Sequence, residues 1–302
     1  MALPVDPLWP RAGAWPARAL ETVAGDPVDL AIVGVPTWRT SLSGSGAHAT
    51  PAAIRAALRF YSEFADGRAL GLRFADLGDA VDPDADDNAA TALVAAAAAV
   101  ARLVVVLGGD NAATVPAALG VFGAELPTAG LVTLDAHHDL RDGVNNGSPV
   151  RRLLEAGLDG RRIVQVGIAD FANSAEYTRR AADAGITVVQ RDALHGRPMA
   201  DVMAEALEIA GGAGGPVHVD LDVDVCDRSV APACPASIPG GIAAHELRAA
   251  ARAAGAHPAV RSIDLTEVDA TADAPDGRTV RLAALCVLEA AAGLAARTAA
   301  PS

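Results

Sequence analysis

Apolar runs alternate with helix-like segments along most of the chain. Residues 102–107 and 130–134 are short, mostly hydrophobic and rich in Val and Leu, as are strands buried on both faces of a sheet. Between such runs lie segments with helical character, for example the Ala-rich stretch 89–101. Regular alternation of strands and helices is typical of a mostly parallel sheet with helices on both faces. The pattern therefore predicts a three-layer α/β/α fold.

The other elements follow from the same pattern. Further strands are expected at 29–35, 72–77, 163–167, 186–190, 216–224 and 260–265, and further helices from 50, after 111, from 150, and at 174–184, 199–210, 242–254 and 279–296. Thr50 is the expected N-cap of its helix, with Pro51 at the first helical position. Because we find no linker, composition shift or internal repeat, we expect a single domain over residues 1–302. The Pro- and Ala-rich segment 1–27 is expected to wrap its surface.

Composition narrows the class of protein. Hydrophobic residues make up 51%, enough for a sizeable core, and the formal net charge is −13 with no lysine. Such a chain lacks the basic face that nucleic-acid binding requires. We find no run of about 18 apolar residues without a charge and no basic-then-apolar leader, so we expect no membrane span and no secretory signal. Three cysteines, an odd and sparse set, fit a reducing compartment, and we expect a cytoplasmic homo-oligomer.

Candidate chemistry begins where the apolar run 130–134 ends. Asp135, His137 and Asp139 follow it at every second position. On an extended segment such residues point to one face, and the carboxyl ends of parallel strands are where α/β proteins bind their ligands. Taken alone, this pattern fits a solvated acidic turn as well as a metal site.

A second run, 217–227, favours the metal site. Asp220, Asp222 and Asp224 again alternate at the end of an apolar segment, where three like charges would repel one another. A divalent cation is the natural counter-charge for two such groups of carboxylates. A ligand set of mostly carboxylate oxygens with one or two imidazoles favours Mn(II) over Zn(II) or Mg(II).

These motifs carry a family resemblance. Asp135-Ala-His-His-Asp139 resembles the Asp-Ala-His-x-Asp signature of the ureohydrolases, the arginase and agmatinase superfamily. The segment 222–227 resembles that family's Asp-x-Asp-x-x-Asp signature, and Gly108-Gly-Asp110 the start of its Gly-Gly-Asp-His. Asp264-Leu-Thr-Glu267 is similar to the segment whose glutamate holds the substrate's guanidinium. The matches span roughly residues 30 to 295 in the family's order, so the resemblance implies an arginase-like metallohydrolase domain.

The resemblance implies a site for two Mn(II) ions. Asp135 and Asp222 are expected to bridge the two ions. Asp139 would bind one ion, and His137 and Asp224 would bind the other. Asn111 stands where the family has its first histidine. An asparagine carbonyl binds a transition metal more weakly than an imidazole does, so one ion is expected to be held loosely. Asn146 stands where arginases have a histidine proposed as a proton shuttle, which argues against arginase proper.

Other motifs resemble one branch of the superfamily. Gly-Gly-Asp-Asn, His-His-Asp-Leu-Arg, Asn-Gly-Ser-Pro-Val-Arg and Phe171-Ala-Asn-Ser174 with Tyr177 are similar to the formimidoylglutamase-like branch. The implied substrate is N-formimidoyl-L-glutamate, a small amidine with two carboxylates. A guanidinium such as Arg141 can grip a carboxylate with two hydrogen bonds, although a salt bridge to the acidic site is the alternative role. The candidate substrate-binding residues are Arg141, Asn145, Asn146, Arg151, Asn173, Ser174 and Glu267.

The expected mechanism follows from these roles. Two cations would lower the pKa of a shared water. Glu267 would bind the protonated formimidoyl group, while Asp139 would accept a hydrogen bond from the attacking water and pass its proton to the leaving amine. The products would be glutamate and formamide, as in histidine degradation.

Two alternatives remain open on the sequence. One is another ureohydrolase activity, such as that of an agmatinase or a guanidinobutyrase. The other is a catalytically degenerate binding protein, suggested by Asn111, although intact Asp139 and Glu267 weigh against it. His48, in a Gly/Ser-rich loop, is a candidate substitute ligand or proton shuttle, whereas His138 is expected to be a core or supporting residue.

Overall fold

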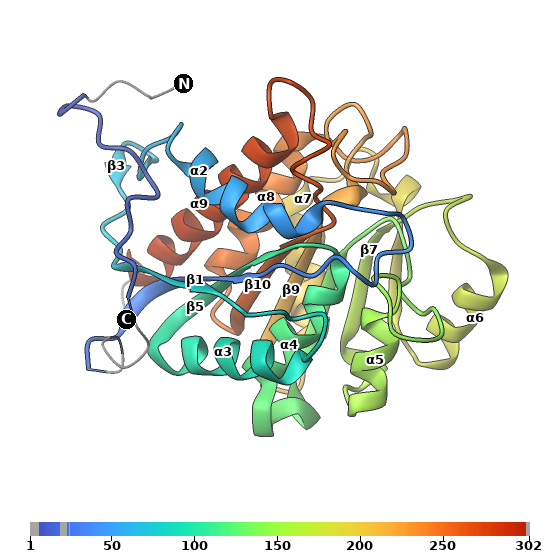
Figure 1. The fold of residues 1–302 in the computed structure, drawn as a ribbon. Coiled ribbons are helices and arrows are strands. Elements are labelled where there is room, and N and C mark those ends of the chain that lie inside the picture. The colour runs from blue at the N-terminus through green and yellow to red at the C-terminus, as the bar shows by residue number, and fades with distance from the viewer. Residues whose placement is uncertain (1–5, 19–22, 24, 300–302) are drawn as a thin grey trace.

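The computed structural model describes residues 6–18, 23 and 25–299, and its centre is an eight-stranded sheet (Figure 1). Every strand pair in this sheet is parallel, and the order is β4-β1-β5-β10-β9-β6-β7-β8. The strands are β1 (Val28–Val35), β4 (Phe74–Asp79), β5 (Ala101–Gly108), β6 (Gly130–Leu134), β7 (Ile163–Ile168), β8 (Thr187–Gln190), β9 (Val217–Asp222) and β10 (Val260–Thr266). A separate antiparallel pair is formed by β2 (Phe64–Ala65) and β3 (Arg68–Ala69).

Helices cover both faces of the sheet, which confirms the predicted three-layer architecture (Figure 1). One layer holds α2 (Thr50–Leu58), α7 (Met199–Ala210), α8 (Ala244–Ala256) and α9 (Arg278–Ala299); the other holds α3 (Asp87–Val100), α4 (Thr114–Phe122), α5 (Pro149–Ala156) and α6 (Ala175–Asp183). Strand β5 shows why both faces must be covered. Leu103 and Val105 pack on the first side, while Val104 and Val106 pack on the second, and all four are fully buried.

The strand order brings distant parts of the chain together. Strands β10, β9 and β6 are neighbours at the centre of the sheet, although they are far apart in the sequence. Because all three run parallel, their carboxyl ends meet at one edge. The two acidic motifs and Glu267 each follow one of these strands, so the topology itself assembles them into one site.

Two local expectations were wrong. Thr50 is not the N-cap of α2 but its first residue, and Ala49 occupies the cap position. The Thr50 hydroxyl instead donates a hydrogen bond to the carbonyl of Val268, so a tertiary contact takes the group that a cap would use. The strand expected at 216–224 ends at Asp222, because residues Val223–Val225 turn into a short 3-10 helix.

The amino-terminal segment lies along the edge strand β4 where it is described. Trp15 stacks on Phe74 with ring centroids 4.4 Å apart, and Ala17 forms a β-bridge with Asp76. The remainder of the predicted surface-wrapping segment, at 1–5, 19–22 and 24, lies outside the described residues.

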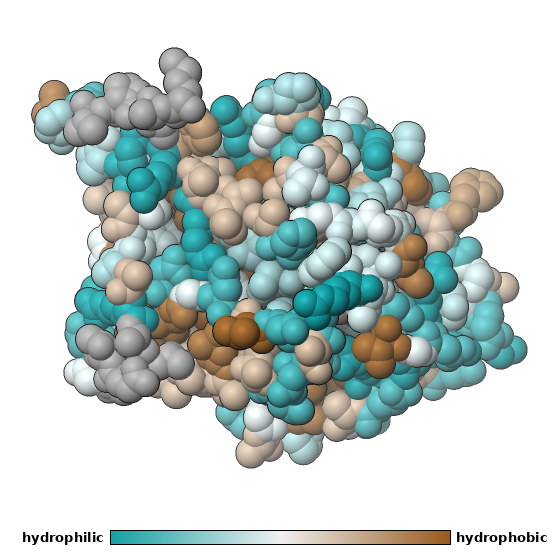
Figure 2. Space-filling view, in the orientation of Figure 1, coloured by the Kyte–Doolittle hydropathy of each residue, from teal (hydrophilic) through white to brown (hydrophobic). Residues whose placement is uncertain are grey.

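Helix α9 is the one described helix that is long and apolar enough to cross a membrane. However, 83% of its apolar window is buried inside the protein, where it packs against α8 and α2. On the face seen in Figure 2, strongly hydrophobic residues form small separate patches. The hydrophobicity of α9 is therefore that of a core helix.

The contact between α8 and α9 depends on two glycines and generates a test of the fold. A Cβ on Gly255 would lie 2.2 Å from the carbonyl oxygen of Ala290, and one on Gly293 would lie 2.2 Å from that of Arg252. We expect Gly255→Ala to lower the free energy of unfolding by about 1–3 kcal/mol, because backbone overlap costs more than the gain in helix propensity. Urea denaturation measures it, with Gly44→Ala as the control, since nothing lies within 4 Å of a Cβ there. An unchanged midpoint for Gly255→Ala would contradict the packing.

Candidate metal and active site

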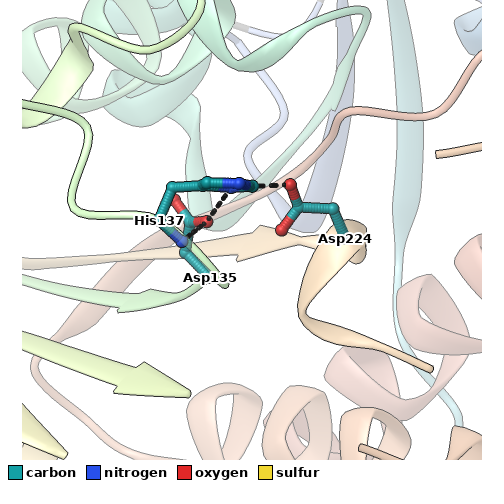
Figure 3. A group of neighbouring side chains, drawn as sticks. All are labelled: Asp135, His137 and Asp224. Atoms are coloured by element: carbon teal, nitrogen blue, oxygen red, sulfur yellow. Dashed lines mark hydrogen bonds and ion pairs between the residues drawn. The ribbon is translucent and has the colours of Figure 1, made fainter. Parts of the chain in front are cut away.

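Two groups of potential metal ligands share one aspartate. Asp135, His137 and Asp224 form the first group, and Asp135, Asp139 and Asp222 form the second; within each group the ligand atoms lie within 4.8 Å of one another. In Figure 3 the side chains of the first group point toward a common centre. The structure therefore brings together the five charged or imidazole ligands expected from the sequence, with Asp135 between the two groups.

Tight turns, and not extended strands, direct these side chains. Asp135 accepts a hydrogen bond from the backbone N–H of His137 at 2.6 Å, and Asp222 accepts one from that of Asp224 at 2.9 Å. Each strand thus ends in a turn in which an aspartate holds the residue two positions later. This local bonding, more than the expected period-two alternation, explains why both motifs converge.

The donor set fits a bound cation. Asp135, Asp139, Asp222 and Asp224 are all less than a tenth exposed, and among the described residues the buried Oδ2 atom of Asp135 has no hydrogen-bond partner. Burial and the neighbouring Asp224 raise the pKa of Asp135 to about 6. Burial and like charge also raise the pKa values of Asp139 and Asp222 well above the usual range. A divalent ion bound here would reduce the repulsion among these carboxylates and would give the unpaired buried oxygen a partner.

The imidazole of His137 lies close to both carboxylates of the first group. Its Nδ1 lies 3.0 Å from Asp224 Oδ2 and 3.4 Å from Asp135 Oδ1. Burial by itself would lower the pKa of His137, but Asp224 and Asp135 raise it overall to about 12. The imidazole of His137 therefore lies between the two carboxylates of the first group.

Asp139 and Glu267 are held in strained backbone conformations at the cavity. Their φ angles are +54° and +60°, which non-glycine residues rarely adopt. Burial and the charge of Asp110 raise the pKa of Glu267 to about 8. Asn111 contacts both residues, because its backbone N–H donates to Glu267 Oε1 at 2.8 Å and its side-chain amide donates to Asp139 Oδ2 at 2.5 Å.

A cavity of about 310 Å³ opens beside these groups. The predicted site residues that line it are His137, Asp139, Asp222, Asp224, Arg141, Asn146, Asn173, Ser174 and Glu267. Asn173 is also a structural anchor, since its amide donates to the carbonyls of Ala136 and Ala169. Ser174 caps α6 through its hydroxyl, which accepts the N–H of Tyr177.

Other predicted residues lie outside the cavity lining. The guanidinium of Arg151 binds the carbonyls of Arg141 and Gly143 and pairs with Glu155, so it braces the loop. The Asn145 amide donates to the carbonyl of Asp142.

The last two candidates are Asn111, whose side-chain oxygen accepts hydrogen bonds from hydroxyl groups, and His48, whose ring packs against an aromatic side chain. The carbonyl oxygen of Asn111 accepts from Thr114 at 2.6 Å and from Thr266 at 3.3 Å. His48 packs against Trp38, with ring centroids 4.7 Å apart. His138 is buried and its Nδ1 lies 2.7 Å from Gln165 Oε1, and the residue also contributes to the cavity lining.

Arg191 is a residue that sequence reasoning missed. It is 8% exposed and donates to the carbonyls of Gly167 at 3.3 Å and Val225 at 3.2 Å, which ties β7 to the ligand-bearing turn. Burial lowers its pKa, while Asp224 and Asp135 counteract that effect. It thus places a guanidinium near Asp224 and Asp135, and a single arginine after a strand gives no sequence signal for this role.

Metal removal should have a pH-dependent effect on stability. Asp135, Asp139 and Asp222 have raised folded-state pKa values, so the metal-free protein loses stability as pH rises from about 4, the unfolded value, through about 6 and beyond. A bound divalent ion offsets this loss, because it competes with protons and stabilises the ionised carboxylates. We therefore expect the gain in Tm on adding Mn(II) to chelator-treated protein to grow between about pH 5 and about pH 8.

Differential scanning calorimetry at several pH values measures this effect. Asp222→Asn is the matched variant, since it removes one repelling charge and one ligand. It should flatten the pH dependence of the metal-free protein and reduce the gain from metal. A metal-free protein whose Tm stays constant over this pH range would contradict the electrostatic account.

Comparisons with known proteins agree with this geometry. A model of the arginase family matches residues 28–293. The formimidoylglutamase of Halalkalibacterium halodurans is 33% identical over 256 residues, 80% of each chain, and the guanidinobutyrase of Pseudomonas aeruginosa is 31% identical over 222 residues, 68% of each chain. The crystal structure of formimidoylglutamase from Bacillus subtilis matches with a TM-score of 0.89 at 28% identity, covering 97% of this chain and 94% of that one. The chain belongs to the arginase family.

Proposed function

We propose that this protein hydrolyses the amidine C–N bond of N-formimidoyl-L-glutamate and releases L-glutamate and formamide, as a step of histidine degradation. The observation that carries the proposal is the composition of the cavity. Its lining combines buried carboxylates with the exposed side chain of Arg141. A substrate with a cationic amidine and an anionic tail matches this polarity.

The amidine end is supported by Glu267. One of its carboxylate oxygens, Oε1, is bonded by Asn111 and Asn146, and the side chain lines the cavity. A protonated formimidoyl group would bring its N–H donors to this carboxylate, and the positive charge would keep Glu267 ionised despite its raised pKa. This pairing would orient the electrophilic carbon toward Asp139.

Asp139 is the proposed proton carrier. Metal ions held by Asp135, His137, Asp139, Asp222 and Asp224 would supply charge balance and lower the pKa of a water. The Asp139 carboxylate, held by the Asn111 amide, would accept a hydrogen bond from the attacking water. As water adds to the formimidoyl carbon and the C–N bond to glutamate breaks, Asp139 would deliver a proton to the leaving nitrogen.

The tail end is supported by Arg141. Its side chain makes no hydrogen bond or ion pair within the described residues, and the guanidinium lies 5.9 Å from the ring centre of Tyr177. The salt bridge to the acidic site, which was the alternative role of Arg141, is therefore not formed within the described residues. A free guanidinium beside the amide of Asn146 and the α6 amino end at Ser174 suits a carboxylate.

We further propose two Mn(II) ions of unequal affinity in a cytoplasmic homo-oligomer that binds neither nucleic acid nor membrane. Carboxylate oxygens with one imidazole favour manganese. The weaker ion would be the one bound beside Asn111, because its carbonyl oxygen is already shared by Thr114 and Thr266. The runner-up activity is that of a guanidino-acid hydrolase, which the similarity to a guanidinobutyrase supports.

A substrate panel tests the proposal. With added Mn(II), purified protein should hydrolyse N-formimidoyl-L-glutamate with a higher kcat/KM than 4-guanidinobutyrate, agmatine or arginine. Formamide, urea and glutamate would be quantified by chromatography. Higher turnover of 4-guanidinobutyrate would promote the runner-up, whereas no turnover of any amidine or guanidine would support a degenerate binding protein.

Arg141 tests the assignment of the tail. We expect Arg141→Ala to lower kcat/KM for formimidoylglutamate about ten- to a hundredfold, because a charged hydrogen bond to a carboxylate is lost. Agmatine carries a cation at that end, so its slower turnover should be unchanged or improved. Arg161→Ala serves as the control, because it removes a surface guanidinium that pairs with Asp159 and does not line the cavity. Equal losses for both substrates would refute the assignment.

A further inference from the structure

The carboxylate of Glu267 offers its two oxygens unequally to the cavity. Oε1 accepts the backbone N–H of Asn111 at 2.8 Å and the side-chain amide of Asn146 at 2.7 Å. A carboxylate oxygen has about two acceptor positions, so both positions of Oε1 are occupied. No described residue donates to Oε2.

The orientation of the Asn146 amide is fixed from both sides. Its Oδ1 accepts the backbone N–H of Leu42 at 2.9 Å, and a backbone N–H can pair only with an acceptor. The Nδ2 group is thereby turned toward Glu267, where only a donor can pair with a carboxylate. Leu42 also lines the cavity, so Asn146 connects the loop that carries Leu42 to Glu267.

We infer that Asn146 determines specificity at this site by occupying Oε1 with its own donor, so that the cavity accepts a formimidoyl group and disfavours a guanidino group. This inference rests on the proposed function, in which Glu267 binds the substrate's cation. A guanidinium carries an NH₂ group where a formimidoyl carbon carries hydrogen, and therefore has two more N–H donors. With Oε1 occupied, Glu267 has no second oxygen for these donors, and an N–H left unpaired in a buried site is costly.

The test uses two substrates with one tail. N-formimidoyl-L-glutamate and N-carbamimidoyl-L-glutamate differ only in the group on the reacting carbon, and they release formamide and urea, respectively. We expect the kcat/KM of wild-type protein to favour the formimidoyl substrate. Asn146→Ala and Asn146→Asp, the latter retaining an acceptor for Leu42, should each shift the ratio at least about tenfold toward the guanidino substrate, the value of one satisfied hydrogen bond.

A matched control and two further readouts separate specificity from damage to the fold. Asn145→Ala changes the adjacent asparagine, whose amide bonds to Asp142, and should leave the ratio unchanged whatever its total activity. Metal content should be equal in all variants, and the shift should appear largely in KM, or in the inhibition constant if the guanidino compound is not turned over.

The outcomes distinguish the inference from the proposed function. A ratio that stays the same in both Asn146 variants would overturn the role of Asn146, even if formimidoylglutamate is the best substrate. If formimidoylglutamate is not hydrolysed, the proposed function fails. The ratio is then measured with N-formimidoyl- and guanidino-forms of 4-aminobutyrate, where a shift on Asn146 replacement sustains the inference and an unchanged ratio overturns it.

Discussion

Burial of like charge at one edge of the sheet is the constraint on which the rest of this site depends. The carboxylates that converge there are each less than a tenth exposed; they are Asp135, Asp139, Asp222, Asp224 and Glu267. The basic side chains of His137 and Arg191 lie beside them. The carboxylates outnumber these two basic groups, so protons or metal ions must supply further positive charge. The raised pKa values of Asp135, Asp139, Asp222 and Glu267 express this imbalance, and the stabilisation expected on metal binding would have the same cause.

A buried polar layer beneath the site supports this concentration of charge. His218 lies 2.7 Å from Ser262 and 3.1 Å from Asp264, and all three are fully buried between β9 and β10. Asp220 and Thr266 are bonded at 3.2 Å, and Thr266 continues to the Asn111 carbonyl. Because these polar groups pair only in one register of the two strands, the layer fixes how β9 and β10 present Asp222 and Glu267.

Hydrophobic periodicity predicted the sheet and its helices because nearly every element buries a continuous face, as 102–107 and 199–210 do. The two acidic motifs were also recognisable, since each places its potential ligands two residues apart in the chain. The order of the strands in the sheet could not be predicted, because no local sequence pattern indicates which strands are neighbours. Hydrogen-bonded partners far apart in the sequence were therefore beyond reach, as the bond between Asn146 and Glu267 and the position of Arg191 illustrate. Extended alternation was also assumed where Asp139 in fact adopts a positive φ.

Two asparagines give the site a particular chemical character. Asn111 and Asn146 each have both ends of the amide engaged, and each directs its donor to a carboxylate, Asp139 and Glu267, respectively. An imidazole at either position could bind metal or carry a proton, whereas an amide does not titrate in the pH range in which enzymes work. Proton transfer in the proposed reaction therefore falls to Asp139, whose burial and strained backbone hold it against the reacting centre. In this proposal both amides act only through their hydrogen bonds. They restrict where the two carboxylates can accept further hydrogen bonds, and therefore which cation the carboxylates bind best.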